Sequence, residues 1–296
     1  MEHKTAHDFD QELLILFDAY VHGVLDRRGF LDQAAKYAVG GVTAAMLLDQ
    51  LSPRFAEAQV VKTDDQRIAP EYLEYDSPNG NGRMRGYFVA PAAATAKLPG
   101  ILVIHENRGL NPHIEDVARR FALENFVAFA PDALFPLGGY PGTEDQAREL
   151  FPKLDQAKTR EDFVAGAAFL KARPECTGKI GAVGFCYGGG MVNYLATRLG
   201  NDLSAGVPFY GSSPNTEHVA KIRSPLMVQS AEVDQRINAS WPAFEAALKA
   251  ANVTYERHLY PGTQHGFHND TTPRYDEAAA RLAWERTITF LNKYVR

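Results

Sequence analysis

From Val60 to the C-terminus, short apolar runs alternate with segments of helical periodicity, and this alternation most limits the possible folds. Near-continuous apolar runs are typical of strands that other elements cover on both faces. Repeated strand–helix–strand order predicts an α/β fold with a mostly parallel, doubly wound sheet and helices on both faces. The expected strands are 100–104, 126–130, 180–185, 205–210, 226–230 and 255–260, and the expected helices are 114–123, 162–172, 189–199, 241–250 and 277–294.

An antiparallel hairpin is expected ahead of these elements. Residues 72–75 and 84–89 have strand patterns and flank the sequence PNGNG at 78–82. Gly and Asn in such a cluster are typical of a tight turn. Neither an internal repeat nor a low-complexity linker interrupts the later sequence, so residues 59–296 are expected to form one domain.

Residues 1–58 differ from the rest and allow two interpretations. Arginines at 27–28 precede an Ala- and Gly-rich apolar stretch at 34–48, and the triplet AEA at 56–58 suits a signal peptidase. The segment thus resembles a twin-arginine export signal, which would make the protein periplasmic. Alternatively, apolar residues at helical spacing between positions 13 and 25 indicate an amphipathic helix, and so a helical appendage on a cytoplasmic protein.

Composition and charge narrow the class of partner. The 31 Lys and Arg against 36 Asp and Glu give a net charge of -5, and no basic stripe is present. A small-molecule partner is therefore favoured over nucleic acid. Cys176 and Cys186 flank an expected strand and should lie too far apart to form a disulfide. The apolar N-terminal stretch is too short and too broken to span a membrane, and a homodimer through the N-terminal helices is a further hypothesis.

The most informative motif is GFCYGGG at 184–190. The strand 180–185 runs into it and a helix follows, which is the G-x-nucleophile-x-G arrangement in its expected context. Such a sharp turn leaves no room for a side chain at Gly184 or Gly188. Free N–H groups at the start of the helix favour a thiolate and stabilise negative charge on a carbonyl oxygen. We predict that Cys186 is a nucleophile, although a lone cysteine after a strand is more often inert.

A catalytic triad also requires an acid and a histidine, and both follow in the expected chain order. Asp234 comes after the strand 226–230, and His265 comes after the strand 255–260. Because the carboxyl ends of parallel strands meet at one edge of a sheet, both side chains are expected near Cys186.

Two neighbouring residues remain alternatives for these roles. Glu232 could replace Asp234 as the acid, and His268 could replace His265 as the base. The spacing of these residues is compatible with metal binding, but a single His-x-x-His pair is a weak zinc signal. The sequence therefore predicts neither a metal site nor an organic cofactor.

The cysteine motif, together with HENRGLN at 105–111 and GTQHGF at 262–267, resembles the dienelactone hydrolase family. The likeness covers about residues 72–295, and it is specific because cysteine stands where this fold usually carries serine. It implies an α/β-hydrolase fold and a carboxymethylenebutenolidase-like hydrolase that cleaves esters or lactones.

The resemblance also implies roles for three further residues. Glu106 matches a family glutamate that contacts the resting cysteine and keeps it from being a permanently exposed thiolate. The backbone N–H groups of Asn107 and Tyr187 match the oxyanion hole. The residues themselves support the first assignment, because Glu106 follows the apolar run 101–104 and should face the same edge as Cys186, although an exposed loop carboxylate is the alternative.

Substrate recognition departs from the family pattern. Family members that act on dienelactone hold its carboxylate with arginines, one of which lies just beyond the catalytic histidine, where this chain has Asn269. Arg148 loosely matches the other, and Arg108 and Arg236 lie near the expected mouth, although each could simply be a surface residue. These departures make neutral short esters or lactones the expected substrates rather than dienelactone itself.

Two competing functions remain at this stage. A thioesterase or peptidase-like hydrolase would use the same three residues, since the sequence does not display the acyl pocket. A non-catalytic binding module would predict a damaged triad, whereas Cys186, Asp234 and His265 are all present.

Overall fold

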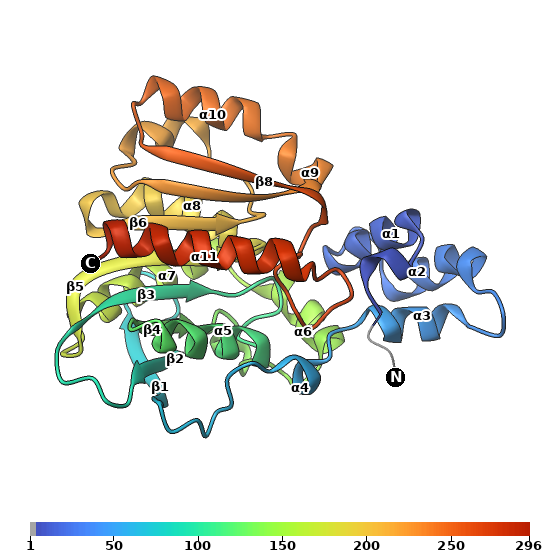
Figure 1. The fold of residues 1–296 in the computed structure, drawn as a ribbon, viewed down its shortest axis with the longest axis horizontal. Helices are drawn as coiled ribbons and strands as arrows, with labels where there is room; N and C mark the ends of the chain where they lie inside the picture. The colour runs from blue at the N-terminus through green and yellow to red at the C-terminus, as the bar shows by residue number, and fades with distance from the viewer. Residues whose placement is uncertain (1–3) are drawn as a thin grey trace.

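The structure is a computed structural model that describes residues 4–296. An eight-stranded sheet in the order β1-β2-β4-β3-β5-β6-β7-β8 runs through its centre (Figure 1). The strands β3 to β8 are parallel, and the hairpin β1-β2 joins β4 in antiparallel register. The predicted hairpin and the mostly parallel sheet are thereby confirmed. The strands are β1 (Ile68–Ser77), β2 (Gly82–Pro91), β3 (Leu98–Ile104), β4 (Val127–Pro131), β5 (Cys176–Phe185), β6 (Ala205–Phe209), β7 (Leu226–Val233) and β8 (Tyr255–Gln264).

Helices cover both faces of the sheet, which explains the continuous apolar runs. In β3, Ile101 and Val103 pack in a core shared with α5 and α11, whereas Leu102 and Ile104 pack in a core shared with α7, α8 and α10. Successive side chains of a strand point to opposite faces, so a strand buried on both sides needs apolar residues throughout. The helices are α5 (Pro112–Leu123), α7 (Gln156–Ala172), α8 (Tyr187–Leu199), α10 (Trp241–Ala250) and α11 (Glu277–Tyr294).

Two short α-helices around the sheet, in the part of the chain after residue 59, were not predicted from the sequence. The helix α6 (Glu144–Leu150) begins after the Thr143 side chain, which accepts a hydrogen bond from the Gln146 backbone. The helix α9 (Gln235–Asn238) begins after Asp234, whose carboxylate accepts from the Ile237 backbone. Both are too short and too polar to give a clear apolar period, so local capping defines them.

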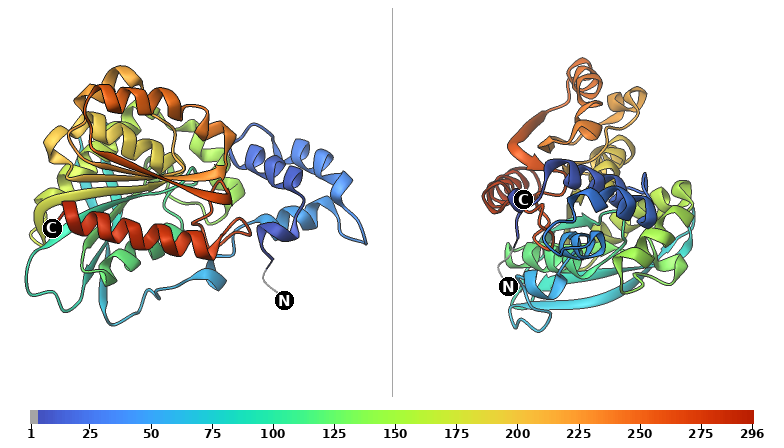
Figure 2. Two further views of the ribbon diagram at one scale, coloured as in Figure 1. Left: turned by 45° about the horizontal axis from the view of Figure 1, so that its top comes forward. Right: turned by 90° about the vertical axis from the view of Figure 1, so that its right-hand side faces the viewer.

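The N-terminal segment forms helices with a core of their own. These are α1 (Gln11–Val21), α2 (Arg27–Ala34), α3 (Ala44–Leu51) and α4 (Phe55–Ala58). Figures 1 and 2 show α1, α2 and α3 grouped beside the edge where the parallel strands end. The buried residues of this group are Leu13, Leu14, Phe17, Tyr20, Phe30, Ala34, Leu47, Leu48 and Leu51.

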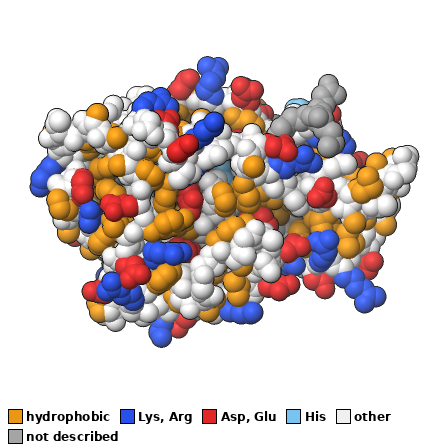
Figure 3. Space-filling model, turned by 90° about the horizontal axis from the view of Figure 1, so that it is seen from below, with side chains coloured by type: hydrophobic (Ala, Val, Ile, Leu, Met, Phe, Trp, Pro, Cys, Tyr) orange, Lys and Arg blue, Asp and Glu red, His pale blue; other side chains and the backbone are white. Residues whose placement is uncertain are grey.

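One face of the molecule carries charged side chains of both signs. Seen from below, acidic and basic side chains are interspersed with hydrophobic ones (Figure 3). Within residues 4–296, none of the helices combines the length and the apolar character needed to cross a membrane.

Candidate active site

The turn from β5 into α8 holds Cys186 in a strained conformation. Its φ of 54° and ψ of -110° lie in a region that residues with side chains rarely adopt. A Cβ on Gly184 would lie 2.2 Å from the carbonyl oxygen of Gly188, and one on Gly188 would lie 2.2 Å from that of Ile104. The two glycines are therefore required for the close packing that presents the sulfur at the sheet edge, as the motif predicts.

Two loops at the same edge bring an acid and a histidine to the sulfur. Asp234 follows β7 and His265 follows β8, and Oδ2 of Asp234 lies 2.6 Å from Nδ1 of His265. An imidazole nitrogen of His265 lies within 4.8 Å of the Cys186 sulfur, and its Nε2 is buried without another partner among the described residues. The structure thus brings together the three residues predicted to form the triad.

The alternative acid and base lie elsewhere. Glu232 is exposed, and its carboxylate accepts a hydrogen bond from the backbone of Gly262. His268 is buried and packs against the rings of Phe185 and Phe209. Burial, together with the positive charge of Arg120, lowers the pKa of His268 to about 3. A histidine that stays neutral in the core has the properties of a packing residue.

The charge state of the cysteine depends on its imidazole neighbours. Burial raises the pKa of Cys186, but the opposite charges of His265 and then His22 outweigh it and lower this pKa to about 6. Burial conversely lowers the pKa of His265, and the thiolate and Asp234 together raise it to about 10. The two shifts have the same cause, which is the attraction between a thiolate and an imidazolium in a site shielded from water.

A histidine that the sequence did not indicate also lies beside the sulfur. Nε2 of His22 lies 3.3 Å from the Cys186 sulfur. Glu106, expected to contact the cysteine, instead accepts a hydrogen bond of 2.8 Å from the side chain of Asn269. The backbone N–H of Tyr187 begins α8 and lacks an acceptor within that helix, while Asn107 lines the cavity beside the sulfur.

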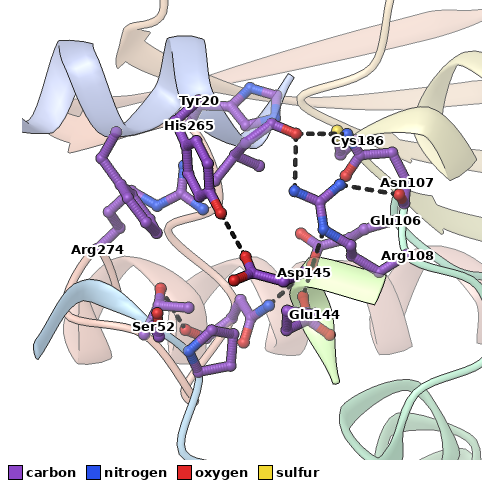
Figure 4. Close-up of a pocket in the computed structure, with 15 residues that line it drawn as sticks. Tyr20, Ser52, Glu106, Asn107, Arg108, Glu144, Asp145, Cys186, His265 and Arg274 are labelled. Atoms are coloured by element: carbon purple, nitrogen blue, oxygen red, sulfur yellow. Dashed lines mark hydrogen bonds and ion pairs between the residues drawn. The ribbon is translucent and has the colours of Figure 1, made fainter. Parts of the chain in front are cut away.

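The cavity beside the sulfur is small because the N-terminal segment covers it. Its volume is about 40 Å³, whereas pockets for drug-sized ligands enclose ~300–1,000 Å³. Figure 4 shows the Tyr20 hydroxyl of α1 hydrogen-bonded to Asp145 at this cavity. The lining residues are Phe17, Tyr20, Val21, Ser52, Pro53, Glu106, Asn107, Arg108, Glu144, Asp145, Cys186, His265, Asn269, Thr272 and Arg274.

One sulfur and two imidazole nitrogens lie close enough together to be reached by one soft metal ion. The sulfur of Cys186 and one nitrogen each of His22 and His265 lie within 4.8 Å of one another. However, the guanidinium of Arg236 lies 3.0 Å from Nε2 of His22. A fixed positive charge at this position disfavours a second cation, so the cluster is better explained by acid–base chemistry.

Comparison with known proteins agrees with the fold and the motifs. Residues 84–295 match the model of the dienelactone hydrolase family. The chain belongs to the dienelactone hydrolase family. Its activity class is hydrolysis of ester or lactone bonds, so the non-catalytic interpretation is set aside. Residues 1–36 separately match the model of a YqhI-like family.

Relatives from this family show which part of the chain they share. Protein usf of Aquifex pyrophilus is 34% identical over 226 residues, which are 72% of this chain and 94% of that protein. The “Putative hydrolase fragment YghX” of Escherichia coli is 52% identical over 114 residues, 38% of this chain and 97% of the fragment. A crystal structure named “Putative Dienelactone Hydrolase” from Klebsiella pneumoniae is 27% identical with a TM-score of 0.66, and covers 76% of this chain and all of its own.

The three arginines predicted to bind substrate differ from one another in their surroundings. Arg108 is buried, and its Nε lies 3.6 Å from Glu144. The guanidinium of Arg148 lies over the ring of Tyr20 at 4.5 Å, and Arg236 is half-exposed beside His22. Only Arg108 among these three lines the cavity.

A fourth arginine, not predicted from the sequence, also lines the cavity. Arg274 is buried, and its Nη1 lies 3.3 Å from the carboxylate of Asp18 in α1. It lies beyond His265 in the chain, as the family arginine does, but further along than Asn269. The position of a loop arginine relative to the site depends on the path of the loop, which spacing alone did not predict.

Proposed function

We propose that this enzyme cleaves a carboxylic ester or lactone through a thioester on Cys186, with His265 and Asp234 as its catalytic partners. The proposal depends above all on the 2.6 Å contact between Asp234 and His265 beside the strained Cys186. Acyl transfer requires a nucleophile, a base in contact with the nucleophile, and a third group that orients the base.

The first half of the reaction forms the acyl-enzyme. The Cys186 thiolate adds to the carbonyl carbon, and the oxygen takes up the negative charge. The backbone N–H groups of Asn107 and Tyr187 are the proposed donors to this oxyanion. The bond from carbon to the leaving oxygen then breaks, the His265 imidazolium gives that oxygen a proton, and the acyl group remains on sulfur.

The second half of the reaction releases the acid. Neutral His265 accepts a proton from water as the water attacks the thioester carbonyl. The carbon–sulfur bond breaks, which restores the thiolate and imidazolium pair and frees the carboxylic acid. Asp234 holds the imidazole in the tautomer that has Nε2 free.

The pH dependence should reflect this ion pair. We expect kcat/KM to fall as the pH drops through about 6, where Cys186 takes up a proton. An unperturbed thiol would give this limb near pH ~8.5. Activity should fall again as the pH rises through about 10, where His265 loses the proton that the leaving group needs. An acid limb above pH ~8 would contradict the proposed pairing.

Substrate charge offers a test of the acyl pocket. Both buried arginines of the cavity are already paired with acids, Arg108 with Glu144 and Arg274 with Asp18. We therefore expect a neutral lactone to be cleaved at least as efficiently as its carboxylated form, because little unpaired positive charge is left for the carboxylate. The measurement is kcat/KM for a carboxylated lactone and its methyl ester on one preparation.

A preference of ~10-fold or more for the free acid would contradict this expectation, because that factor corresponds to about 1.4 kcal/mol of extra transition-state binding. Replacing Arg108 or Arg274 with Gln would then identify which arginine is responsible. Absence of hydrolysis of any ester, lactone or thioester would overturn the proposed function itself.

A further inference from the structure

The histidine beside the nucleophile is held in place from its other side. His22 follows the last residue of α1, and its side chain is only 12% exposed. Nδ1 lies 2.8 Å from the Asp18 carbonyl oxygen and 3.3 Å from the Asp18 carboxylate. With Nδ1 bound in this way, Nε2 is directed at the Cys186 sulfur, 3.3 Å away. This arrangement parallels the contact of His265 with Asp234, and the two imidazole rings meet edge to face at 4.8 Å.

The end of α1 is also anchored to the loop after β3. The Val21 carbonyl accepts hydrogen bonds from the side chains of Asn107, at 3.0 Å, and Arg108, at 2.8 Å. Carbonyl groups at a helix C-terminus lack partners within the helix, so these two donors satisfy an otherwise unpaired group. The main body of the enzyme therefore binds α1 at the site itself.

A second set of contacts holds the same helices to α6. Asp145 accepts a hydrogen bond from the hydroxyl of Tyr20 and pairs with Arg27 at 2.7 Å. The ion pair of Arg27 with Asp145 is about half exposed and does not include the Cys186 sulfur. It therefore helps to hold the N-terminal helices against α6 and takes no part in the chemistry.

Substrate and His22 compete for the same space. An attacking sulfur must come within ~3–3.5 Å of the carbonyl carbon, and His22 already lies at that distance. The remaining cavity of about 40 Å³ has room for only a few water molecules, since one occupies ~10–15 Å³ by this measure. The described arrangement is therefore a closed one.

We propose that His22 is a further residue of the active site, which holds the Cys186 sulfur as a thiolate in the closed enzyme and withdraws with α1 when the substrate enters. The inference rests on the proposed role of Cys186 as the nucleophile. It assigns to the N-terminal segment the contact with the resting cysteine that the family resemblance implied for Glu106.

The charges around His22 favour its protonated form. Burial lowers the pKa of His22, but the Cys186 thiolate and Asp18 outweigh it and raise this pKa. His265 opposes them with a like charge. Arg236 on α9 opposes them too, because its guanidinium can only donate and its 3.0 Å hydrogen bond to Nε2 requires that nitrogen to be unprotonated. The protonated form of His22 therefore requires the Arg236 side chain, which is 45% exposed, to turn away from Nε2 into water.

Two further arginines and an acid complete the surroundings. Arg274 contacts the same Asp18 oxygen as His22 does, each at 3.3 Å, while Arg108 and Glu106 line the cavity beside the sulfur. An imidazolium at His22 would stabilise the thiolate, whereas a carboxylate in contact with the sulfur would disfavour it. Coverage by α1 would meanwhile shield this reactive thiolate from oxidants and alkylating agents.

The test measures alkylation of Cys186 by iodoacetamide in the full-length protein, followed by intact mass from pH ~5 to ~9. Cys186→Ser identifies the labelled site, because Cys176 is also a free but buried thiol. The wild type should show a midpoint near pH about 6. In His22→Gln the midpoint should move up by ~1 pH unit, so that the fraction reacting at the wild-type midpoint falls roughly fivefold. The limiting rate at high pH should rise, because the sulfur is less shielded.

Two companion variants separate charge from coverage. Arg27→Gln loosens the segment at Asp145 and should raise the limiting rate without moving the midpoint. Asp18→Asn removes the negative charge that stabilises the His22 imidazolium, and it should move the midpoint upward by less than His22→Gln does. This second variant provides the test if His22→Gln folds poorly. An unchanged midpoint in folded His22→Gln or Asp18→Asn would overturn the proposal. Alkylation needs no turnover, so this result is independent of whether the enzyme cleaves esters, which the hydrolysis rates of the wild type and of Cys186→Ala test separately.

Discussion

Replacing Cys186 with Ala is expected to lower kcat for ester hydrolysis by ~10³-fold or more, because removal of an attacking group leaves only the oxyanion hole and substrate binding. The fold should survive, because the change removes a single buried sulfur atom and keeps the backbone of the turn. Initial rates on a chromogenic ester, with circular dichroism as a check of folding, give the comparison.

Cys176→Ala is the matched control for this variant. Cys176 is equally a buried free thiol, but it lies at the start of β5, at the opposite end of the strand from the site. We expect it to retain wild-type kcat. Wild-type turnover by Cys186→Ala would rule out the proposed nucleophile.

His265→Ala and Asp234→Asn are expected to lower kcat strongly but not independently. Asp234 acts through its 2.6 Å contact with His265, so it has little to contribute once the imidazole is gone. The double variant should therefore be about as slow as the slower single variant, as residues that act as a unit are non-additive. The measurement is a double-mutant cycle of kcat/KM on one ester.

Asn is preferred to Ala at position 234 for a structural reason. The Asp234 carboxylate also accepts a hydrogen bond from the Ile237 backbone and so caps α9. Loss of such a cap costs ~1 kcal/mol of stability, whereas Asn retains an acceptor there. Losses that multiply as independent factors would argue against a shared role for the two residues.

Most of the sheet and the residues Cys186, Asp234 and His265 could be predicted from the sequence, because both depend on short sequence patterns and on the order of elements along the chain. A strand buried on both faces has a recognisable composition, and the glycines around Cys186 are required by contacts within a few residues. Asp234 and His265 then follow from the rule that parallel strands present their carboxyl ends at one edge.

What the sequence could not predict are the contacts made across long separations. His22 and Cys186 are 164 residues apart in the chain. No motif around α1 indicates that the end of this helix docks on the edge of the sheet that carries Cys186. Its apolar residues indicated a helix but not its docking partner, because they form the core of the N-terminal segment itself. The orientation of Glu106 toward Asn269 similarly depends on the loop path after β8.

The most direct test of the account is to locate the acyl group on the enzyme during turnover. An ester with a good leaving group is mixed with excess enzyme, quenched in acid, digested and mapped by mass spectrometry. The account predicts a burst of leaving group and an acyl group on Cys186 that neutral hydroxylamine removes, as expected of a thioester intermediate. An acyl group on any other side chain, or steady turnover by a protein whose Cys186 is fully alkylated, would contradict it.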